Sequence, residues 1–230
     1  FVGYAGDVAQ VFGASRSGQT GWSEPAEIDG VDNADVDATN LVMNRQGQGV
    51  LVMQAPQARV HARRFAFSGA APEWLDAAAP YVANHTDGGG YGTSTSVDDA
   101  GRIHIVSVHG NGRRLSRWMH DGQGWGALQS IADLSASSEA LPVLLYPALA
   151  SDGAGNLMVA WNEFSGSDGW RVMARRHHVG LDQWRDTSLP LASAQSGLVT
   201  PGLVLRSDGT GSLLGLVSQG AQHVRGAEFR

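Results

Sequence analysis

The chain has 230 residues, of which 42% are hydrophobic, 17% are charged and 31 are Gly, so it is long and apolar enough to bury the core of one domain. Its formal net charge is -6, and its 16 basic residues are all Arg and are spread along the chain, which argues against nucleic acid or an anionic membrane as a partner. The absence of Cys excludes disulfides, thiolate metal sites and a Cys nucleophile, and no apolar run approaches the roughly 20 residues of a transmembrane span.

The first segment, residues 1–32, predicts the later strands of an incomplete repeat. Its sequence VAQVFGASRSGQTGWSEPAEI (Val8 to Ile28) begins as a strand and passes through a polar turn that ends on Trp22. Because the chain begins at Phe1 without a Met, we expect a leader or upstream sequence to be absent from it. We therefore expect an extracytoplasmic protein of bacterial type, which is periplasmic, secreted or surface-anchored.

An Asp-rich stretch, DGVDNADVD, follows this segment. Asp29, Asp32, Asp35 and Asp37 could hold Ca²⁺ through carboxylate oxygens. The spacing differs from that of an EF-hand loop, which has Gly at its sixth position and a late Glu. We expect a solvated loop here, and the sequence predicts neither a metal site nor a cofactor.

Four segments with the same pattern recur along the chain, each with a polar turn before an apolar run. Period-two alternation bounded by Gly and Asp predicts a strand pair joined by a tight turn, in which Asp152 bonds its own backbone and Gly153 and Gly155 take positive φ. Aligned on Gly49, Gly101, Gly155 and Gly211, the segments are about 52 to 56 residues apart. They are LVMNRQGQGVLVMQ (Leu41 to Gln54), TSTSVDDAGRIHIVSV (Thr93 to Val108), YPALASDGAGNLMVAW (Tyr146 to Trp161) and LRSDGTGSLLGLVSQ (Leu205 to Gln219).

A second recurring feature is a strand and polar turn that end on a Trp: Trp22, Trp74, Trp125 and Trp184. One Trp at one position per unit predicts a packing wedge between neighbouring sheets. Each unit reads as four short strands in about 50 residues without helical periodicity, which is typical of an all-β fold, a β-propeller of four-stranded blades. A stacked solenoid has shorter units or units with helices.

The blade boundaries that the sequence predicts are a partial blade at 1–32, blades at 33–80, 81–133 and 134–194, and a partial blade at 195–230. The two ends supply overlapping strands, so joining them duplicates strands. We expect either a part of a six- or seven-bladed propeller or an irregular ring of about five blades.

The turns before the recurrent Trp resemble the BNR or Asp-box repeats of sialidase-like propellers, in which the turn reads Ser-x-Asp-x-Gly-x-Thr-Trp. The matching segments are SRSGQTGW (Ser15 to Trp22), MHDGQGW (Met119 to Trp125) and HHVGLDQW (His177 to Trp184), which keep the Trp and keep the Asp clearly at Asp121. The resemblance implies a propeller with ligand groups on the face opposite these turns. In sialidases it also implies three Arg that grip a carboxylate, a Tyr-Glu nucleophile pair and an Asp acid. The usual Arg-Ile-Pro is absent, and Arg102-Ile103-His104 lies at a turn on the other face.

Candidate site residues lie in the connections of that opposite face. Glu163 with Tyr146 or Tyr91, and Asp168, are the catalytic candidates, because a glycosidase needs two carboxylates about 5 to 10 Å apart or a Tyr nucleophile with its base. Sugar binding without catalysis requires only aromatic rings that stack on a pyranose and polar groups that bond its hydroxyls. The ligand-binding candidates are His85, Tyr91, His109, Arg113 and Trp170, with Trp118 as a further aromatic. The alternatives are solvated loop acids and Trp side chains packed between blades.

Three functions remain open from the sequence. The first is a binding or scaffold module for carbohydrate without chemistry of its own. The second is a sialidase-like glycoside hydrolase with part of its active site outside this chain. The third is a propeller that docks another protein.

Overall fold

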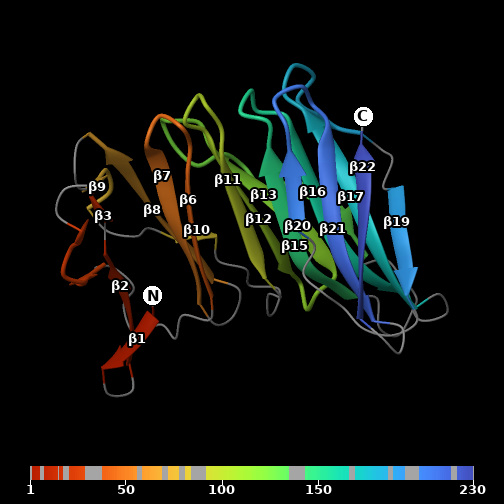
Figure 1. Ribbon diagram of the computed structural model, residues 1–230, viewed down its shortest axis with the longest axis horizontal. Helices are drawn as coiled ribbons and strands as arrows, with labels where there is room; N and C mark the ends of the chain where they lie inside the picture. The colour runs from red at the N-terminus through yellow and green to blue at the C-terminus, as the bar shows by residue number, and fades with distance from the viewer. Residues whose placement is uncertain are drawn as a thin grey trace.

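The computed structural model describes residues 2–5, 8–14, 16–17, 21–28, 38–55, 59–68, 72–77, 81–83, 92–134, 143–165, 169–185, 189–194, 202–218 and 222–229. Every regular element in these residues is a β-strand, and none of them forms a helix that could cross a membrane. Successive antiparallel sheets stand side by side from the N-terminal to the C-terminal end (Figure 1). This confirms the all-β propeller architecture. The sheet of β1 and β2 and the sheet of β20 to β22 lie at opposite ends of this row, so the described sheets do not close into a ring.

Three large sheets form the middle of the molecule, each an antiparallel meander. The first contains β6 (Ala38–Met43), β7 (Gln48–Ala55) and β8 (Arg59–Phe67), with β9 (Pro72–Trp74) and β10 (Tyr81–Ala83) both paired to β8. The second contains β11 (Thr93–Val97), β12 (Ile103–His109), β13 (Arg114–His120) and β14 (Gln129–Asp133). The third contains β15 (Val143–Ser151), β16 (Leu157–Ser165) and β17 (Gly169–His178), with β18 (Gln183–Trp184) and β19 (Leu189–Ala194) paired to β17.

Smaller sheets flank these three. On the N-terminal side are β1 (Val2–Ala5), β2 (Val8–Gly13) and β5 (Ala26–Glu27), beside the two-stranded pair of β3 (Arg16–Ser17) and β4 (Gly21–Trp22). On the C-terminal side are β20 (Gly202–Leu205), β21 (Gly211–Ser218) and β22 (Gln222–Phe229).

The first strands of the successive sheets, β6, β11, β15 and β20, lie next to one another and form the inner edge of the array. Side chains tie them together, since Asn40 Nδ2 donates to Thr93 Oγ1 at 3.2 Å and Ser94 Oγ accepts from the Leu149 backbone N–H at 3.0 Å. We call the end with the turns at 44–47, 98–102, 152–156 and 206–210 the turn end, which is at the top of Figure 1. The opposite end, where β11 and β15 begin and β12 and β16 end, is the loop end.

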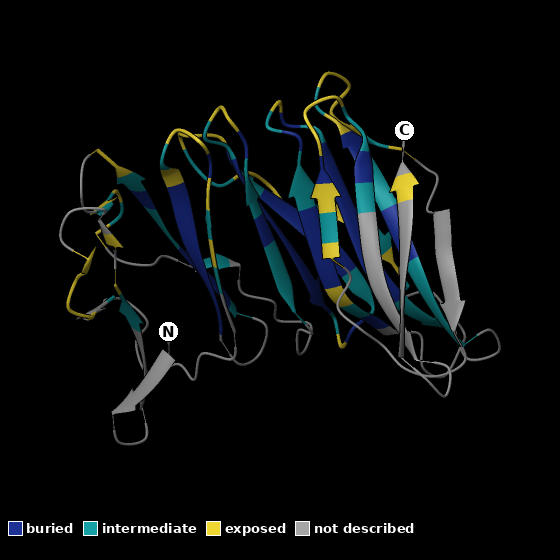
Figure 2. Cartoon of the chain, viewed as in Figure 1, coloured by how far each residue is buried: buried dark blue, intermediate teal, exposed yellow. Residues whose placement is uncertain are grey.

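Hydrophobic side chains fill the spaces between neighbouring sheets. All seven residues of β12 are buried, because this strand lies in the middle of a sheet that is covered on both faces. One face packs with Val50, Val52 and Val60 of the preceding sheet, and the other packs with Leu157, Val159 and Trp161 of the following sheet. Figure 2 shows the buried residues within the sheets and exposed residues on the turns. A strand of this kind reads as a continuous apolar run, as IHIVSV does.

The structure sets the repeat at 54 residues. Gly47, Gly101, Gly155 and Gly209 occupy equivalent turn positions, and all four have positive φ, between 79° and 98°. In the turns that contain Gly47, Gly101 and Gly209, the Gly N–H donates to the carbonyl of the residue three positions earlier. The alignment on Gly49 and Gly211 is therefore corrected by two residues, since both of these lie in the strand that follows the turn.

Two of the four recurrent Trp residues are confirmed as wedges between sheets. Trp125 packs against the apolar cluster shared by the first and second large sheets, and Trp184 packs against the cluster shared by the second and third. Trp184 Nε1 also donates to Gln129 Oε1 of the preceding sheet at 3.3 Å. Each wedge thus inserts toward the preceding sheet. Trp22 differs, because 69% of it is exposed, and together with Trp74 it lines an apolar cavity of about 630 Å³ beside the first large sheet.

Candidate functional site

The described candidate residues gather at the loop end of the second and third large sheets. Tyr146 and Trp170 lie near the starts of β15 and β17, Glu163 near the end of β16, His109 at the end of β12, and Arg113 in the turn that follows it. His85, Tyr91 and Asp168 lie outside the described residues. The loop end is therefore the part of the molecule in which these predictions can be compared with geometry.

Tyr146 is presented by a β-bulge in the innermost strand of the third sheet. Leu145 pairs with Asn162 and Ala148 pairs with Ala160, so Tyr146 and Pro147 together face the single residue Trp161. Tyr146 has a φ of 50°, in the left-handed region that few non-Gly residues adopt, and it is 44% exposed. A bulge redirects a side chain away from the regular pleat, so this backbone turns a large aromatic ring toward solvent at the inner edge.

Trp161 connects the bulge to Glu163. Trp161 is 1% exposed, which makes it the largest fully buried side chain among the described residues, and its Nε1 donates to Glu163 Oε2 at 3.4 Å. Residues two apart on a strand share a face, and the positions opposite Glu163 on the adjacent strands are Leu144 and Arg171. The half-buried Glu163 carboxylate thus lies on a face with an indole N–H and an Arg, two residues along β16 from the position opposite the Tyr146 bulge.

Trp170 lies on the other face of the same sheet. Its ring packs on Phe164 with centroids 4.9 Å apart. The residues of β17 that share its face pack toward β20. It is half-buried in this pair. Tyr146 and Glu163 thus lie on paired strands at the loop end, and Trp170 lies on the other face of the sheet from Glu163.

His109 and Arg113 belong to a tight turn that anchors the next blade. Buried His109 has its Nε2 2.9 Å from Ser116 Oγ, on the face toward the first large sheet. Residues 110–112 all have positive φ, and the Gly112 carbonyl accepts from the Leu144 N–H at 2.6 Å. The Arg113 carbonyl accepts from the Leu134 N–H at 2.7 Å. The HGNGR segment thus fixes where β15 begins. Trp118, the further aromatic candidate, is buried near His109 with ring centroids 6.5 Å apart.

Sequence reasoning did not single out Arg171 or Trp161 as parts of the site. The alternation of WNE in β16 places Trp161 and Glu163 on one face, so this pair was readable. The position of Arg171 opposite Glu163 follows from the register of the hairpin between β16 and β17. Within the described residues no three His, Asp or Glu side chains converge as metal ligands, and Asp29, Asp32, Asp35 and Asp37 lie outside those residues.

A cluster of buried ionisable groups with lowered pKa lies at the turn end, between the second and third sheets. Burial is the main reason that the pKa of His177 falls to about 4, and nearby Arg117 lowers it further. Asp182 lies 3.2 Å from His177 Nε2 and 3.9 Å from Arg117 Nη2, while the Arg117 guanidinium lies over Trp184 at 5.7 Å. Arg117 and His177 are both buried. This cluster is packed between sheets, so we assign it to stability and not to a ligand site.

Neither a family model nor a curated protein matches the chain in sequence. Solved structures do match it in fold. An ulvan lyase of polysaccharide lyase family PL25, bound to -[GlcA(1-4)Rha3S]-, is 13% identical, with a TM-score of 0.60 over 99% of this chain and 68% of its own. A protein of unknown function from Dyadobacter fermentans is also 13% identical, with a TM-score of 0.61 over 99% of this chain and 66% of its own.

An endo-arabinase from Bacteroides thetaiotaomicron is 15% identical, with a TM-score of 0.54 over 98% of this chain and 87% of its own. At these identities the likeness concerns the fold, and it agrees with the propeller architecture. The chain spans about two thirds of the length of the ulvan lyase and of the Dyadobacter protein.

Proposed function

We propose that this chain is a carbohydrate-binding β-propeller module, with its ligand at the loop end of β15 and β16. The observation that carries the proposal is Tyr146, an exposed aromatic side chain held at positive φ by a bulge on the inner edge of the array. Backbone in sparsely populated φ/ψ regions costs about 1 to 3 kcal/mol and tends to occur where a side chain has a ligand to meet. A Tyr ring offers an apolar face for the carbon skeleton of a sugar and a hydroxyl at its edge.

The polar neighbours of the bulge suit the hydroxyl groups of a sugar. The Glu163 carboxylate accepts hydrogen bonds, and Arg171 donates them in a fixed planar geometry. The structural neighbours support the same class of ligand, because they include an ulvan lyase bound to -[GlcA(1-4)Rha3S]- and a Fusarium graminearum α-L-arabinofuranosidase with arabinobiose. An extracytoplasmic location is part of the proposal, because polysaccharides of this kind lie outside the cell.

The proposal is binding without catalysis. A glycosidase needs two suitably spaced carboxyl groups, or a Tyr nucleophile with its base, and what the site offers within the described residues is Glu163 and Tyr146. A sialidase-like hydrolase whose remaining groups lie outside this chain, and a propeller that docks another protein, are the other outcomes of the test.

The test is binding to a polysaccharide array that includes ulvan and arabinan, followed by calorimetry on the best ligand. Tyr146→Ala is expected to weaken binding by about tenfold or more, because it removes the stacking ring. Trp22→Ala is the matched control, since it removes an exposed aromatic residue at the turn end. Ligand cleavage that Glu163→Gln abolishes would establish a hydrolase, and absence of any bound glycan would leave protein docking.

A further inference from the structure

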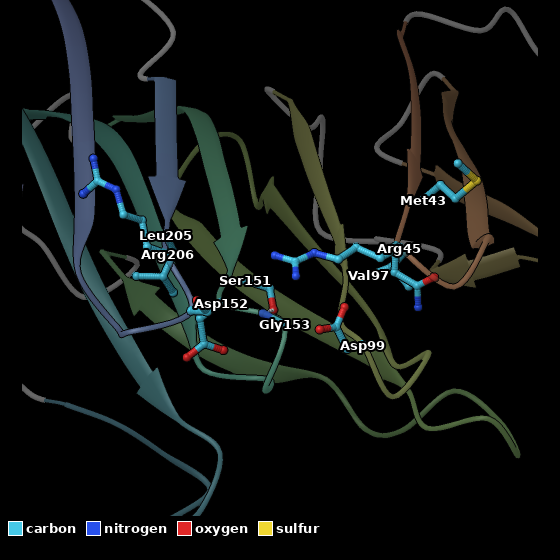
Figure 3. Close-up of a pocket in the computed structure, with 11 residues that line it drawn as sticks. Met43, Arg45, Val97, Asp99, Ser151, Asp152, Gly153, Leu205 and Arg206 are labelled. Carbon is cyan, nitrogen blue, oxygen red and sulfur yellow. Dashed lines mark hydrogen bonds between the residues drawn. The ribbon is translucent and has the colours of Figure 1, made fainter.

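The turn end contains a cavity of about 510 Å³ that is built from the repeat itself (Figure 3). Its lining comes from the same three positions of four successive units, which are 54 residues apart. The first position supplies Met43, Val97, Ser151 and Leu205, the second supplies Asn44, Asp152 and Arg206, and the third supplies Arg45, Asp99, Gly153 and Ser207. The cavity therefore lies at the inner edge, where the four turns meet, at the end opposite Tyr146.

At the second position, in three of the four units, an Asn or Asp side chain closes the turn through hydrogen bonds. Asn44 Oδ1 accepts from the backbone N–H groups of residues 46 and 48 at 3.0 and 2.9 Å. Asp98 Oδ1 and Asp152 Oδ1 each accept from the equivalent pair of N–H groups at 2.9 to 3.0 Å. These side chains close their own turns, so they are not available to hold a ligand.

The side chains at the third position do not close the turn, and the residues there differ from unit to unit. Within the part of the chain that the structure describes, neither the Arg45 guanidinium nor the Asp99 carboxylate has a hydrogen-bond or ion-pair partner. In Figure 3 the Arg45 side chain extends across the cavity toward Ser151 and Gly153, and Asp99 lines the same cavity. Arg206, in contrast, is turned to its own hairpin, where it donates to Thr210 Oγ1 and Ser212 Oγ at 3.4 Å.

The lining thus combines an unpaired Arg side chain, the Asp99 carboxylate, the Ser207 hydroxyl and an apolar part. Arg is suited to a carboxylate, which it binds through two parallel N–H···O bonds. Asp99 accepts hydrogen bonds, and the exposed Ser207 hydroxyl both donates and accepts them. Val97 and Leu205 supply apolar surface. The volume is in the range of pockets that hold small ligands.

We propose that this cavity is a second binding site, and that it takes a sugar acid, a monosaccharide with a carboxylate. Arg45 binds the carboxylate, Asp99 and Ser207 bond the ring hydroxyls, and Val97 with Leu205 packs on the carbon skeleton. The site is independent of the one proposed around Tyr146, because the two lie at opposite ends of the inner strands.

D-Glucuronate is the probe, titrated into the whole chain by calorimetry or by saturation-transfer NMR. We expect saturable binding at millimolar concentration, and binding of D-glucose that is at least about tenfold weaker, because glucose lacks the carboxylate. Arg45→Gln is expected to reduce glucuronate affinity by about tenfold or more without a change in melting temperature, since the Arg45 side chain is exposed and unpaired among the described residues.

Two matched variants distinguish this site from the other. Arg185→Gln, which removes an exposed Arg elsewhere at the turn end, is expected to leave glucuronate binding unchanged, and so is Tyr146→Ala. Equal affinity for glucose, preference for D-glucosamine, unchanged affinity in Arg45→Gln, or no saturation by about 20 mM glucuronate would each overturn the proposal. Loss of glucuronate binding in Tyr146→Ala would assign the carboxylate ligand to the loop end.

Discussion

The two ends of the inner strands are built on opposite principles. At the turn end, three of four successive units close the same hydrogen-bonded turn with an Asn or Asp side chain, and one Gly with positive φ recurs every 54 residues. At the loop end the units differ, and the described part holds a bulge at Tyr146 in one unit and a turn with three consecutive positive φ values in another. Repetition thus serves assembly at one end, while the other end is free to vary.

The turns at the turn end also hold the sheets to one another. The Asp99 N–H donates to the Gly153 carbonyl at 2.9 Å, and Arg102 Nη2 donates to the Ala154 carbonyl at 3.2 Å. Asn44 Nδ2 donates to the Asp98 carbonyl at 2.8 Å. The first three turns therefore contact one another in succession, and we expect substitutions of the side chains that close these turns to act mainly on stability and those around Tyr146 mainly on binding.

Asp98→Ala is the substitution from which we expect the largest loss of stability. The Asp98 side chain is 0% exposed and accepts from two backbone N–H groups and from Arg102 Nε at 2.6 Å. Its removal leaves these donors without their acceptor, which we expect to lower the free energy of unfolding by about 4 kcal/mol. Urea unfolding at pH 7 measures the loss.

Asp98→Asn is the matched variant, because Asn44 closes the equivalent turn naturally. We expect it to lose only about 1 to 2 kcal/mol, since the turn is kept and the ion pair is lost. Burial raises the pKa of Asp98, but the hydrogen bonds from His104 and Arg102 outweigh it, so the pKa is lowered overall. The stability that this carboxylate contributes is therefore present above its unfolded pKa and is lost as pH falls through its folded value. Equal losses in both variants would refute the assigned role.

His177 gives the next largest effect, and it depends on pH. Its pKa is about 4 in the folded chain, mainly because of burial and then because of Arg117. His104 also lowers this pKa, whereas Asp182 raises it. Its unfolded pKa is about 6.5, so between these values the unfolded chain binds more protons. Stability is expected to be constant above about pH 7 and to fall by about 3 kcal/mol toward pH 4.

His177→Phe tests this assignment, because Phe65 packs on Trp74 as His177 packs on Trp184, with ring centroids 5.6 and 5.1 Å apart. His177 Nδ1 is buried and has no hydrogen-bond partner in the described part of the chain, and the partner of Nε2, Asp182, is exposed and can bond water instead, so Phe costs little at pH 7. Urea titrations at pH 7, 6 and 5 should show a reduced pH slope in the variant. An unchanged slope would assign the acid sensitivity to other groups.

Much of the fold was predictable from sequence, and the limits have physical causes. Alternation located the strands, and the recurrent Trp located the wedges between sheets. The alignment on Gly49 and Gly211 failed by two residues because a shift of two leaves the alternation of a strand unchanged, so only the hydrogen bonds of the turn distinguish the registers. The contact of Arg117 with Asp182 joins different sheets, and no local pattern encodes it.

The candidate site was predictable only in part. Pro147 inside an apolar strand signals a bulge, and with that signal Tyr146 could have been recognised as its exposed residue. His109 reads as a loop residue in sequence, yet it is buried against Ser116, because the strand extends further than the HGNG pattern indicates. The cavity at the turn end could not be predicted, because the 54-residue spacing was needed to bring Arg45 and Asp99 to equivalent positions.

Substitution of the recurrent Trp residues is expected to have a smaller effect on the free energy of unfolding. Trp184→Ala removes a half-buried ring and its bond to Gln129, and we expect a loss of about 2 kcal/mol. Trp22→Ala at the equivalent position removes a ring that is 69% exposed, and we expect a change within about 0.5 kcal/mol. Thermal or urea unfolding of the two variants measures the difference. Similar losses would mean that the Trp22 ring is buried in solution.

The smallest effect on stability is expected at the loop end, where binding should change most. Tyr146→Gly relieves the left-handed backbone, whereas Tyr146→Ala keeps it, so we expect the Gly variant to be about 1 kcal/mol more stable than the Ala variant. Both variants lack the ring, so both should lose the same amount of glycan affinity. Urea unfolding and calorimetry on the same preparations separate the two quantities. If the Gly variant is the less stable one, residue 146 does not hold a positive φ in solution, and if either variant still binds glycan normally, the ligand lies elsewhere.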